Sequence, residues 1–297
     1  MVRIIKKIEC IALAAVVIGA FAGCSKENAG SDGGKYGSIK TITTPSDFKG
    51  NTGDVKIESG DTYAVIKIKG YEGEMKCKLF PEAAPEGVDN FVKLANSGYY
   101  SDKIFHRVMK DFMIQGGSAN GDGMSTDSDP EFNVEYNSSM RQYYGALCYA
   151  NAGSINGSQF YIVNNKSYSP VSSKNYENNI AVFDQYISQI EMLLKTATGE
   201  EKDNLEFNLK YYSSMKSSAS SSIRALDELT EEMEEKYKSV GGVPHLDGGY
   251  TVFGQMVEGF EILDAVSKVE VEKQIGSDEE SRPVQDIVIE SVTIHTA

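Results

Sequence analysis

The chain has 297 residues, of which 40% are hydrophobic, and its formal net charge at pH 7 is −14. This length and apolar content are enough for a packed core, so the composition excludes a disordered chain. The acidic balance argues against nucleic acid as a partner, because phosphate binding needs clustered lysine and arginine.

The first residues have the features of an export signal. A positive start is followed by a mostly apolar run over 8–22, which is too short for a transmembrane helix. The run ends at a small residue directly before Cys24, which resembles a bacterial lipoprotein cleavage site. We therefore expect residues 1–23 to be a signal peptide and Cys24 to carry lipid, anchoring the protein outside the cytoplasm to the bacterial cell membrane. The alternative is a plain secretory signal with an incidental cysteine.

The next segment, residues 24–53, is rich in Gly, Ser, Thr, Asn and Lys and has no sustained apolar period. Such a composition is typical of a flexible linker. We expect a lipid-attached tether here, with the folded part beginning near Asp54.

Short strand-like segments follow. The stretches "TYAVIKIKG" (62–70) and "GEMKCKLFP" (73–81) alternate apolar and polar residues, which predicts a strand pair. Helical spacing appears over 84–97, and several short apolar segments bounded by Gly, Asn or Ser come after it. A second short helix is expected near 259–267, followed by a final strand. This pattern indicates a closed or nearly closed β structure.

Two cysteines, Cys77 and Cys148, lie inside the strand-like stretches. Buried free thiols are the favoured interpretation, and a disulfide between them is the alternative. No spacing of Cys and His indicates zinc, so no metal site is expected.

Over residues 164–244 the predicted secondary structure changes from strands to helices. Apolar residues at helical spacing predict a first helix that ends at Gly199 and a second series that continues to Tyr237. One straight helix over 200–238 would be nearly 60 Å long. Either the serine run 216–222 breaks it or the chain over 164–176 runs extended alongside. We favour the break, because serine is a weak helix former.

The familiar catalytic motifs are absent. The chain has three histidines and lacks the GxSxG, P-loop and HExxH patterns of hydrolytic and nucleotide chemistry. Two segments, "FHRVMKDFMIQGG" (105–117) and "YANAGSINGSQFYI" (149–162), instead combine one arginine with apolar, amide and glycine residues. They predict a hydrophobic pocket rimmed by hydrogen-bond donors and one cation, which suits a peptide backbone.

Three segments resemble, in order, the signature blocks of the cyclophilins, which are peptidyl-prolyl cis-trans isomerases. They are "FHRVMKDFMIQGG", "GALCYANAGSINGSQFYIV" and "HLDGGYTVFGQMVEGFEILDAV". The resemblance covers about 61–163 and 245–297. It implies a mainly β fold, an eight-stranded antiparallel β-barrel capped by two helices. The barrel would form one domain over 54–297, and the helical insert 164–244 would interrupt it.

The resemblance also implies site residues. Arg107 would donate to the prolyl amide and stabilise its twisted transition state, and Gln115 would orient the arginine. The other implied substrate-binding residues are Phe112, Met113, Ala150, Asn151, Ala152, Gln159, Tyr161, His245, Leu246 and Tyr250. His106 is expected to be structural, because alternation places its side chain on the face opposite Phe105 and Arg107.

The chain departs from the family pattern at three of these positions. His245 stands where many members have tryptophan, Tyr161 where phenylalanine is usual, and Tyr250 where a histidine is often found. Tyrosine still supplies an aromatic wall, but the missing indole argues against strong cyclosporin binding. The acidic stretch after Gly117 is interpreted as a solvated loop rather than a calcium site.

The expected function is isomerisation of X-Pro bonds in unfolded exported proteins, with proline-containing peptides as substrates, the membrane contacted through the lipid, and no cofactor. The alternative is a lipoprotein that binds such peptides without catalysis. Three roles stay open for the insert: a self-packed decoration, an arm that holds client proteins, or a dimer contact.

Overall fold

The computed structural model describes residues 38–123, 131–152, 154–274 and 277–297. The predicted signal peptide, the lipid site at Cys24 and the first part of the predicted tether lie outside these residues. Within the described part, none of the helices combines the length and the apolar character needed to cross a membrane.

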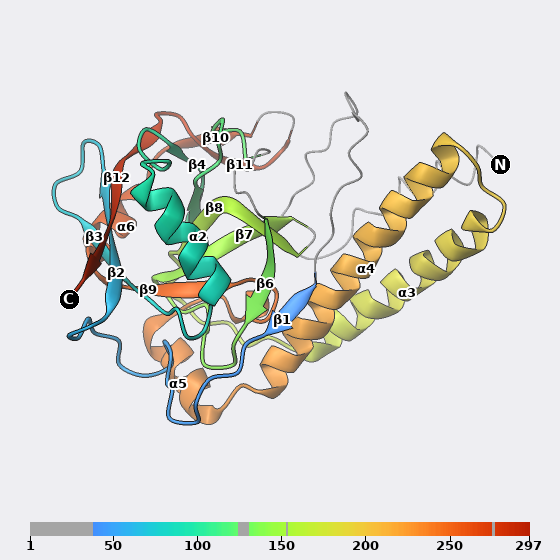
Figure 1. The fold of residues 1–297 in the computed structure, drawn as a ribbon, viewed down its shortest axis with the longest axis horizontal. Coiled ribbons are helices and arrows are strands. Elements are labelled where there is room, and N and C mark those ends of the chain that lie inside the picture. Colours follow the sequence, from blue (N-terminus) through green and yellow to red (C-terminus); the bar gives the residue numbers. More distant parts are fainter. Residues whose placement is uncertain (1–37, 124–130, 153, 275–276) are drawn as a thin grey trace.

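Eight strands close into a barrel in which every pairing is antiparallel (Figure 1). In order around the barrel they are β8 (Ile155–Val163), β5 (Met113–Gly116), β4 (Ile104–Met109), β12 (Ile287–Thr296), β2 (Thr62–Ile68), β3 (Met75–Leu79), β9 (Val252–Glu258) and β7 (Ala146–Ala152). A second pairing of β7 with β8 completes the ring. The predicted fold class is confirmed.

Alternation along the strands divides the apolar side chains into two clusters. On β8, Phe160 and Ile162 belong to the interior cluster, whereas Tyr161 belongs to a second cluster on the outer face. The helices α2 (Pro85–Asn96) and α6 (Phe260–Val266) bury apolar residues in the interior cluster, as expected of the two capping helices. The outer cluster is the foundation of the site described below.

The two cysteines are free and buried. Cys77 belongs to the interior cluster and Cys148 to the outer one, so the barrel wall separates them. Burial raises the pKa of Cys77 to about 12, which keeps this thiol protonated and unreactive.

The described part of the predicted tether is folded. Strand β1 (Ile39–Thr41) pairs in parallel with β6 (Phe132–Tyr136), which in turn pairs with β8. Farther along, the buried Asn51 side chain accepts a hydrogen bond from Arg141 N at 2.8 Å and donates to Arg141 O at 2.7 Å. Folding therefore begins by about residue 38 and not near Asp54. Hydrogen bonds of polar groups hold much of the segment in place. Because the residues that make these bonds are polar, the composition resembles that of a linker.

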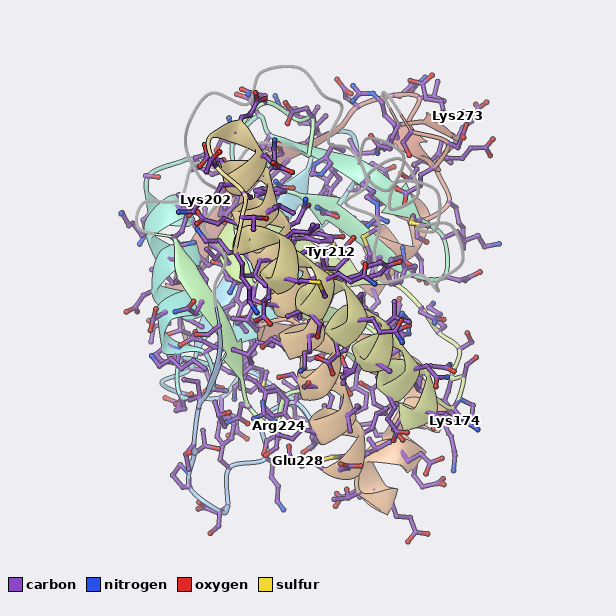
Figure 2. The ribbon with its side chains drawn as sticks, turned by 90° about the vertical axis from the view of Figure 1, so that its right-hand side faces the viewer. Lys174, Lys202, Tyr212, Arg224, Glu228 and Lys273 are labelled. Carbon is purple, nitrogen blue, oxygen red and sulfur yellow. The ribbon has the colours of Figure 1, made fainter. Side chains whose placement is uncertain are left out.

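The insert contains three helices, α3 (Ser173–Leu194), α4 (Glu200–Asp227) and α5 (Glu231–Val240). Helices α3 and α4 pack side by side and project from the barrel as an arm (Figure 1). Figure 2 shows Lys174, at the start of α3, at the same end of the arm as Arg224 and Glu228 at the end of α4, with Lys202 at the opposite end. The two helices are therefore antiparallel.

The predicted break at 216–222 is wrong, because α4 continues through the serine run and ends at Asp227. Ser221 and Ser222 are buried, and a Cβ atom on Gly248 would lie 2.3 Å from Ser221 O. The close approach of the α4 backbone therefore requires a glycine at 248. The chain turns at 228–230 instead, where the Thr230 side chain caps α5 by accepting from Met233 N.

Candidate active site

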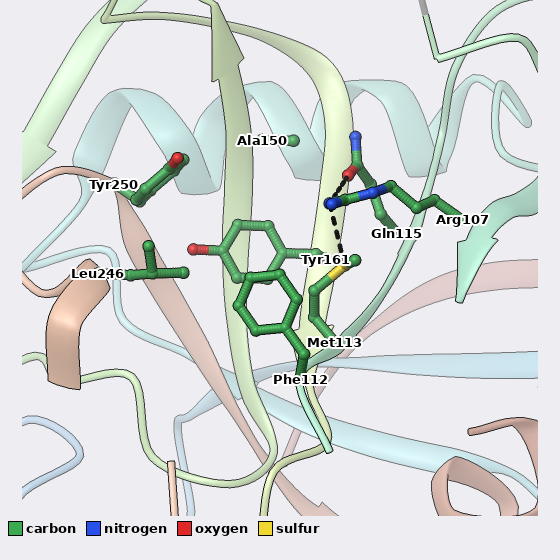
Figure 3. A pocket seen from close by; sticks show the side chains of 8 residues that line it. All are labelled: Arg107, Phe112, Met113, Gln115, Ala150, Tyr161, Leu246 and Tyr250. Carbon is green, nitrogen blue, oxygen red and sulfur yellow. Dashed lines mark hydrogen bonds between the residues drawn. The ribbon is translucent and has the colours of Figure 1, made fainter. Parts of the chain in front are cut away.

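Eight side chains surround an open, shallow pocket on the outer face of the barrel (Figure 3). They are Arg107, Phe112, Met113, Gln115, Ala150, Tyr161, Leu246 and Tyr250. They come from β4 and β5, from β7 and β8, and from the segment around the short 3₁₀ helix η1 (Pro244–Leu246). All eight were predicted as site residues.

Arg107 lies on β4 opposite Gln115 of β5. Its Nη1 group donates to Gln115 Oε1 at 3.4 Å and lies 3.9 Å from the Met113 sulfur (Figure 3). Its Nη2 group lies 3.2 Å from the sulfur of Met109. The guanidinium is thus surrounded by weak acceptors on the side of the pocket.

Sequence reasoning missed the strongest partner of Arg107, which is Glu279. Nε donates to Glu279 Oε1 at 2.6 Å and Nη2 donates to Oε2 at 2.8 Å, a bidentate ion pair. Burial alone would raise the pKa of Glu279, but hydrogen bonds from Arg107 and Ser281 lower the pKa below its ordinary value. Glu279 precedes β11 (Glu280–Pro283), which pairs with β10 (Val271–Lys273). No signal distinguishes it within the acidic run 278–280.

A row of amides fixes the orientation of Gln115. Its Nε2 group donates to Gln159 Oε1 at 3.1 Å, and Gln159 Nε2 donates to Gly123 O at 3.1 Å. The amide oxygen of Gln115 is therefore left facing Arg107. The turn after β5 needs a glycine at Gly117, where φ is +82° and a Cβ atom would lie 2.7 Å from Ser158 O.

Aromatic side chains form much of the apolar wall. Phe112 is fixed by its backbone N–H, which donates to Asn164 Oδ1 at 2.7 Å, and its ring centroid lies 5.9 Å from the Arg107 guanidinium carbon. The rings of Tyr161 and Tyr250 meet edge to face at 5.8 Å. The pocket is thus bounded by apolar surface on these sides and by the cation of Arg107 on another.

Three predicted site residues with described side chains, His245, Asn151 and Gln159, lie outside the lining of the pocket. His245 lies beside it, with its ring stacked 6.2 Å from that of Phe112, and burial lowers the pKa of His245. Asn151 donates through Nδ2 to Gly249 O at 3.0 Å, and Gln159 lies behind Gln115. Ala152 is part of β7, but its side chain lies outside the described residues.

The predicted placement of His106 needs a correction. A register shift between Phe105 and Arg107 interrupts the alternation, so Phe105 enters the interior cluster while Arg107 lines the outer pocket. His106 is buried, burial lowers its pKa to about 4, and neither ring nitrogen has a hydrogen-bond partner among the described residues. Phe105 and Arg107 do not share a face.

Comparison with known families decides the identity of this barrel. The model of the cyclophilin type peptidyl-prolyl cis-trans isomerase/CLD family matches residues 63–213 and 237–294. The chain belongs to the cyclophilin family. All eight residues that line the pocket lie within the matched segments, so the family assignment covers the site as well as the fold.

Putative bacterial peptidyl-prolyl cis-trans isomerases are among the relatives. A putative peptidyl-prolyl cis-trans isomerase of Staphylococcus epidermidis is 34% identical over 226 residues, which covers 75% of this chain and 87% of that protein. One of Staphylococcus haemolyticus is 32% identical over 240 residues, which covers 80% and 94%. A cyclophilin-type isomerase of Cryptosporidium parvum has the same fold, with a TM-score of 0.50 at 21% identity over 80% of this chain and 99% of that one.

Proposed function

We propose that this cyclophilin isomerises X-Pro bonds in exported proteins, using Arg107 to stabilise the twisted amide. Peptidyl-prolyl isomerase activity holds at the level of the family. The observation that supports the finer statement is the position of the Arg107 guanidinium at the edge of a pocket whose other walls are mostly apolar. A proline ring bound against these apolar walls would have the guanidinium beside its amide nitrogen.

The chemistry requires no proton transfer. Rotation about the X-Pro bond is opposed by a barrier of about 20 kcal/mol, because the nitrogen lone pair is delocalised into the carbonyl group. A donor that binds the prolyl nitrogen as it becomes pyramidal favours the twisted state over the planar one. One oriented cation beside an apolar pocket is sufficient for this mechanism.

The ion pair with Glu279 leaves Arg107 with donors to spare. A guanidinium has five N–H groups. Glu279 accepts from Nε and Nη2, and Gln115 accepts from Nη1, which leaves one N–H on each terminal nitrogen facing thioether sulfurs. Since sulfur is a weak acceptor and Met113 lines the pocket, the N–H on Nη1 that faces the Met113 sulfur is available to a substrate.

Export and membrane attachment form the second part of the proposal. It is supported by the positive start, the apolar run over 8–22 and the small residue before Cys24. Cell fractionation tests it: the wild type is expected in the membrane fraction and Cys24→Ser in a soluble fraction, with intact mass showing lipid on the wild type alone. Recovery of both proteins in the cytoplasm would overturn it.

The isomerase mechanism is tested with a proline tetrapeptide whose trans form is cleaved by a coupled protease. We expect Arg107→Ala to lose at least about tenfold in kcat/KM, because a charged hydrogen bond in the transition state is removed. Arg282→Ala, which removes an arginine of β11, is the matched control and should behave as the wild type. The alternative function, peptide binding without catalysis, predicts no rate above the uncatalysed reaction for any of the three proteins.

A further inference from the structure

Gln142 connects two walls of the proline pocket. Its side chain is fully buried. Oε1 accepts from the Tyr161 hydroxyl at 2.6 Å, and Nε2 donates to Leu246 O at 2.6 Å. One side chain therefore holds a wall that comes from β8 and a wall that comes from η1, although Gln142 does not line the pocket itself.

The helical insert holds Gln142 in turn. The hydroxyl of Tyr237, a fully buried residue of α5, accepts from Gln142 N at 3.1 Å and donates to Asp247 Oδ2 at 2.8 Å. Asp247 Oδ1 accepts from the same Gln142 N–H at 2.9 Å. Tyr237 thus joins the two backbone segments that carry Gln142 and Leu246.

A second contact from the insert reaches the same place. Arg141, which precedes Gln142, is fully buried. Its Nη1 group donates to Ala225 O near the end of α4 at 2.6 Å and lies 3.4 Å from Asp247 Oδ2. Helices α4 and α5 are therefore both bonded to the support of the pocket, and the base of the insert is not a separate decoration.

We propose that Gln142 and Tyr237 are positioning residues, through which the insert sets the spacing between Tyr161 and Leu246 and thereby the affinity for the prolyl ring. This inference rests on the proposed function of the same pocket. The contacts that orient Arg107 come from Glu279 and Gln115 and do not include Gln142. Loss of the positioning residues therefore raises KM more than it lowers kcat.

The test is a mutant cycle with the tetrapeptide assay. Gln142→Met keeps the length of the side chain and removes both hydrogen bonds, and Tyr237→Phe removes only the hydroxyl. We expect each to raise KM about threefold to tenfold, the range that one or two neutral hydrogen bonds are worth, with kcat within about twofold of the wild type. Because Tyr237 bonds the Gln142 backbone and acts in part through the Gln142 side chain, Tyr237→Phe should raise KM less in the Gln142→Met background than in the wild type.

A second mutant cycle tests the inference even if Gln142→Met alone folds poorly. Tyr161→Phe leaves Gln142 Oε1 without its partner, whereas the double variant Tyr161→Phe/Gln142→Met has apolar groups on both sides. Tyr161→Phe is expected to raise KM, and the KM of the double variant should lie closer to the wild-type value. Tyr212→Phe, on the arm and away from this network, is the control and should match the wild type.

Two outcomes would overturn the inference: additive effects on KM in both cycles, or a fall in kcat at unchanged KM. The dissociation constant of a proline peptide, measured by titration for the same variants, separates this inference from the proposed function. A wild type that binds peptide without turnover contradicts the proposed catalysis, yet its affinities still test the role of Gln142 and Tyr237.

Discussion

Arg107 is held by a carboxylate that the primary sequence gave no reason to select. The side chains of Arg107 and Glu279 are 13% and 18% exposed, so solvent screens their ion pair only in part. The pair fixes the guanidinium by two hydrogen bonds on one edge and leaves the opposite edge for the substrate. Orientation of Arg107 thus depends on a residue 172 positions away in the chain.

Removal of Glu279 should impair catalysis. We expect Glu279→Ala to lower kcat/KM about fivefold to tenfold, since the arginine loses the charged partner that orients it. Glu279→Gln keeps one acceptor oxygen and should lie between this variant and the wild type. The assay is the tetrapeptide reaction, with the exposed neighbour Glu280→Gln as control. Faster turnover by Glu279→Ala would mean that the carboxylate weakens Arg107 instead of positioning it.

His106 should make stability depend on pH. Its pKa in the folded state is about 4, against 6.5 ordinarily, so the unfolded state binds more protons in this window and the free energy of unfolding falls as pH falls through it. The loss attributable to His106 should reach about 2 kcal/mol at pH 5 relative to pH 7.

Urea unfolding of the wild type and of His106→Leu gives the free energy of unfolding at pH 7 and at pH 5. The wild type should lose more of this free energy between the two pH values than His106→Leu does. The exposed His295→Ala serves as the control and should lose as much as the wild type. An equal loss for the wild type and His106→Leu would contradict the assignment.

At the scale of elements, the insert has two parts with different structural roles. Its base, formed by the end of α4 and by α5, is bonded to the pocket support through Ala225 and Tyr237. Farther out along the arm, the stacked rings of Tyr186 and Tyr212, 4.9 Å apart, join α3 to α4. Large apolar side chains remain exposed there, such as Met192 at 65%.

Truncations should distinguish these parts. Replacement of 187–211 by a short Gly-Ser linker removes only the distal arm, and tetrapeptide kinetics should stay within about twofold of the wild type while unfolding remains cooperative. Replacement of 166–242 removes Tyr237 and leaves the buried Arg141 without Ala225 O, so a large loss of stability is expected. Thermal unfolding and the isomerase assay measure both. Equal behaviour of the two truncations would contradict this division.

The elements were predictable to different degrees. Alternation in β2 and β3 and helical spacing in α2 follow from local sequence, and the barrel followed from the resemblance of three segments. The serine run of α4 was misjudged because its conformation depends on contact with Gly248, which no local pattern reveals. The bulge beside Arg107 and the partnership with Glu279 depend equally on contacts between distant segments.

At the scale of the whole molecule, residues 38–53 join the barrel to the insert. Asn51 bonds to Arg141 on the barrel side, and Lys236 of α5 donates to Asn51 O at 2.7 Å. Nearer the N-terminus, Arg224 of α4 donates to Thr41 Oγ1 at 3.0 Å. A segment with the composition of a linker therefore contributes to stability.

Substitution of Asn51 should show this contribution. Asn51→Ala leaves the backbone groups of the buried Arg141 without partners, and we expect a loss of about 2 to 4 kcal/mol in the free energy of unfolding. Urea denaturation measures it. Asn178→Ala, at an exposed position of α3, is the matched control and should change stability by less than about 0.5 kcal/mol. A loss no larger than that of the control would show that the segment is only loosely attached.

The place of β12 in the ring has a consequence for biogenesis. This strand is the last of the eight along the chain, yet it lies between β2 and β4, with Thr296 opposite Thr62. During vectorial synthesis or transport, β2 and β4 therefore expose unpaired edges until residues 287–296 emerge. Such a high contact order slows closure and lengthens exposure to aggregation. A barrel of this design is complete only after its final strand is delivered.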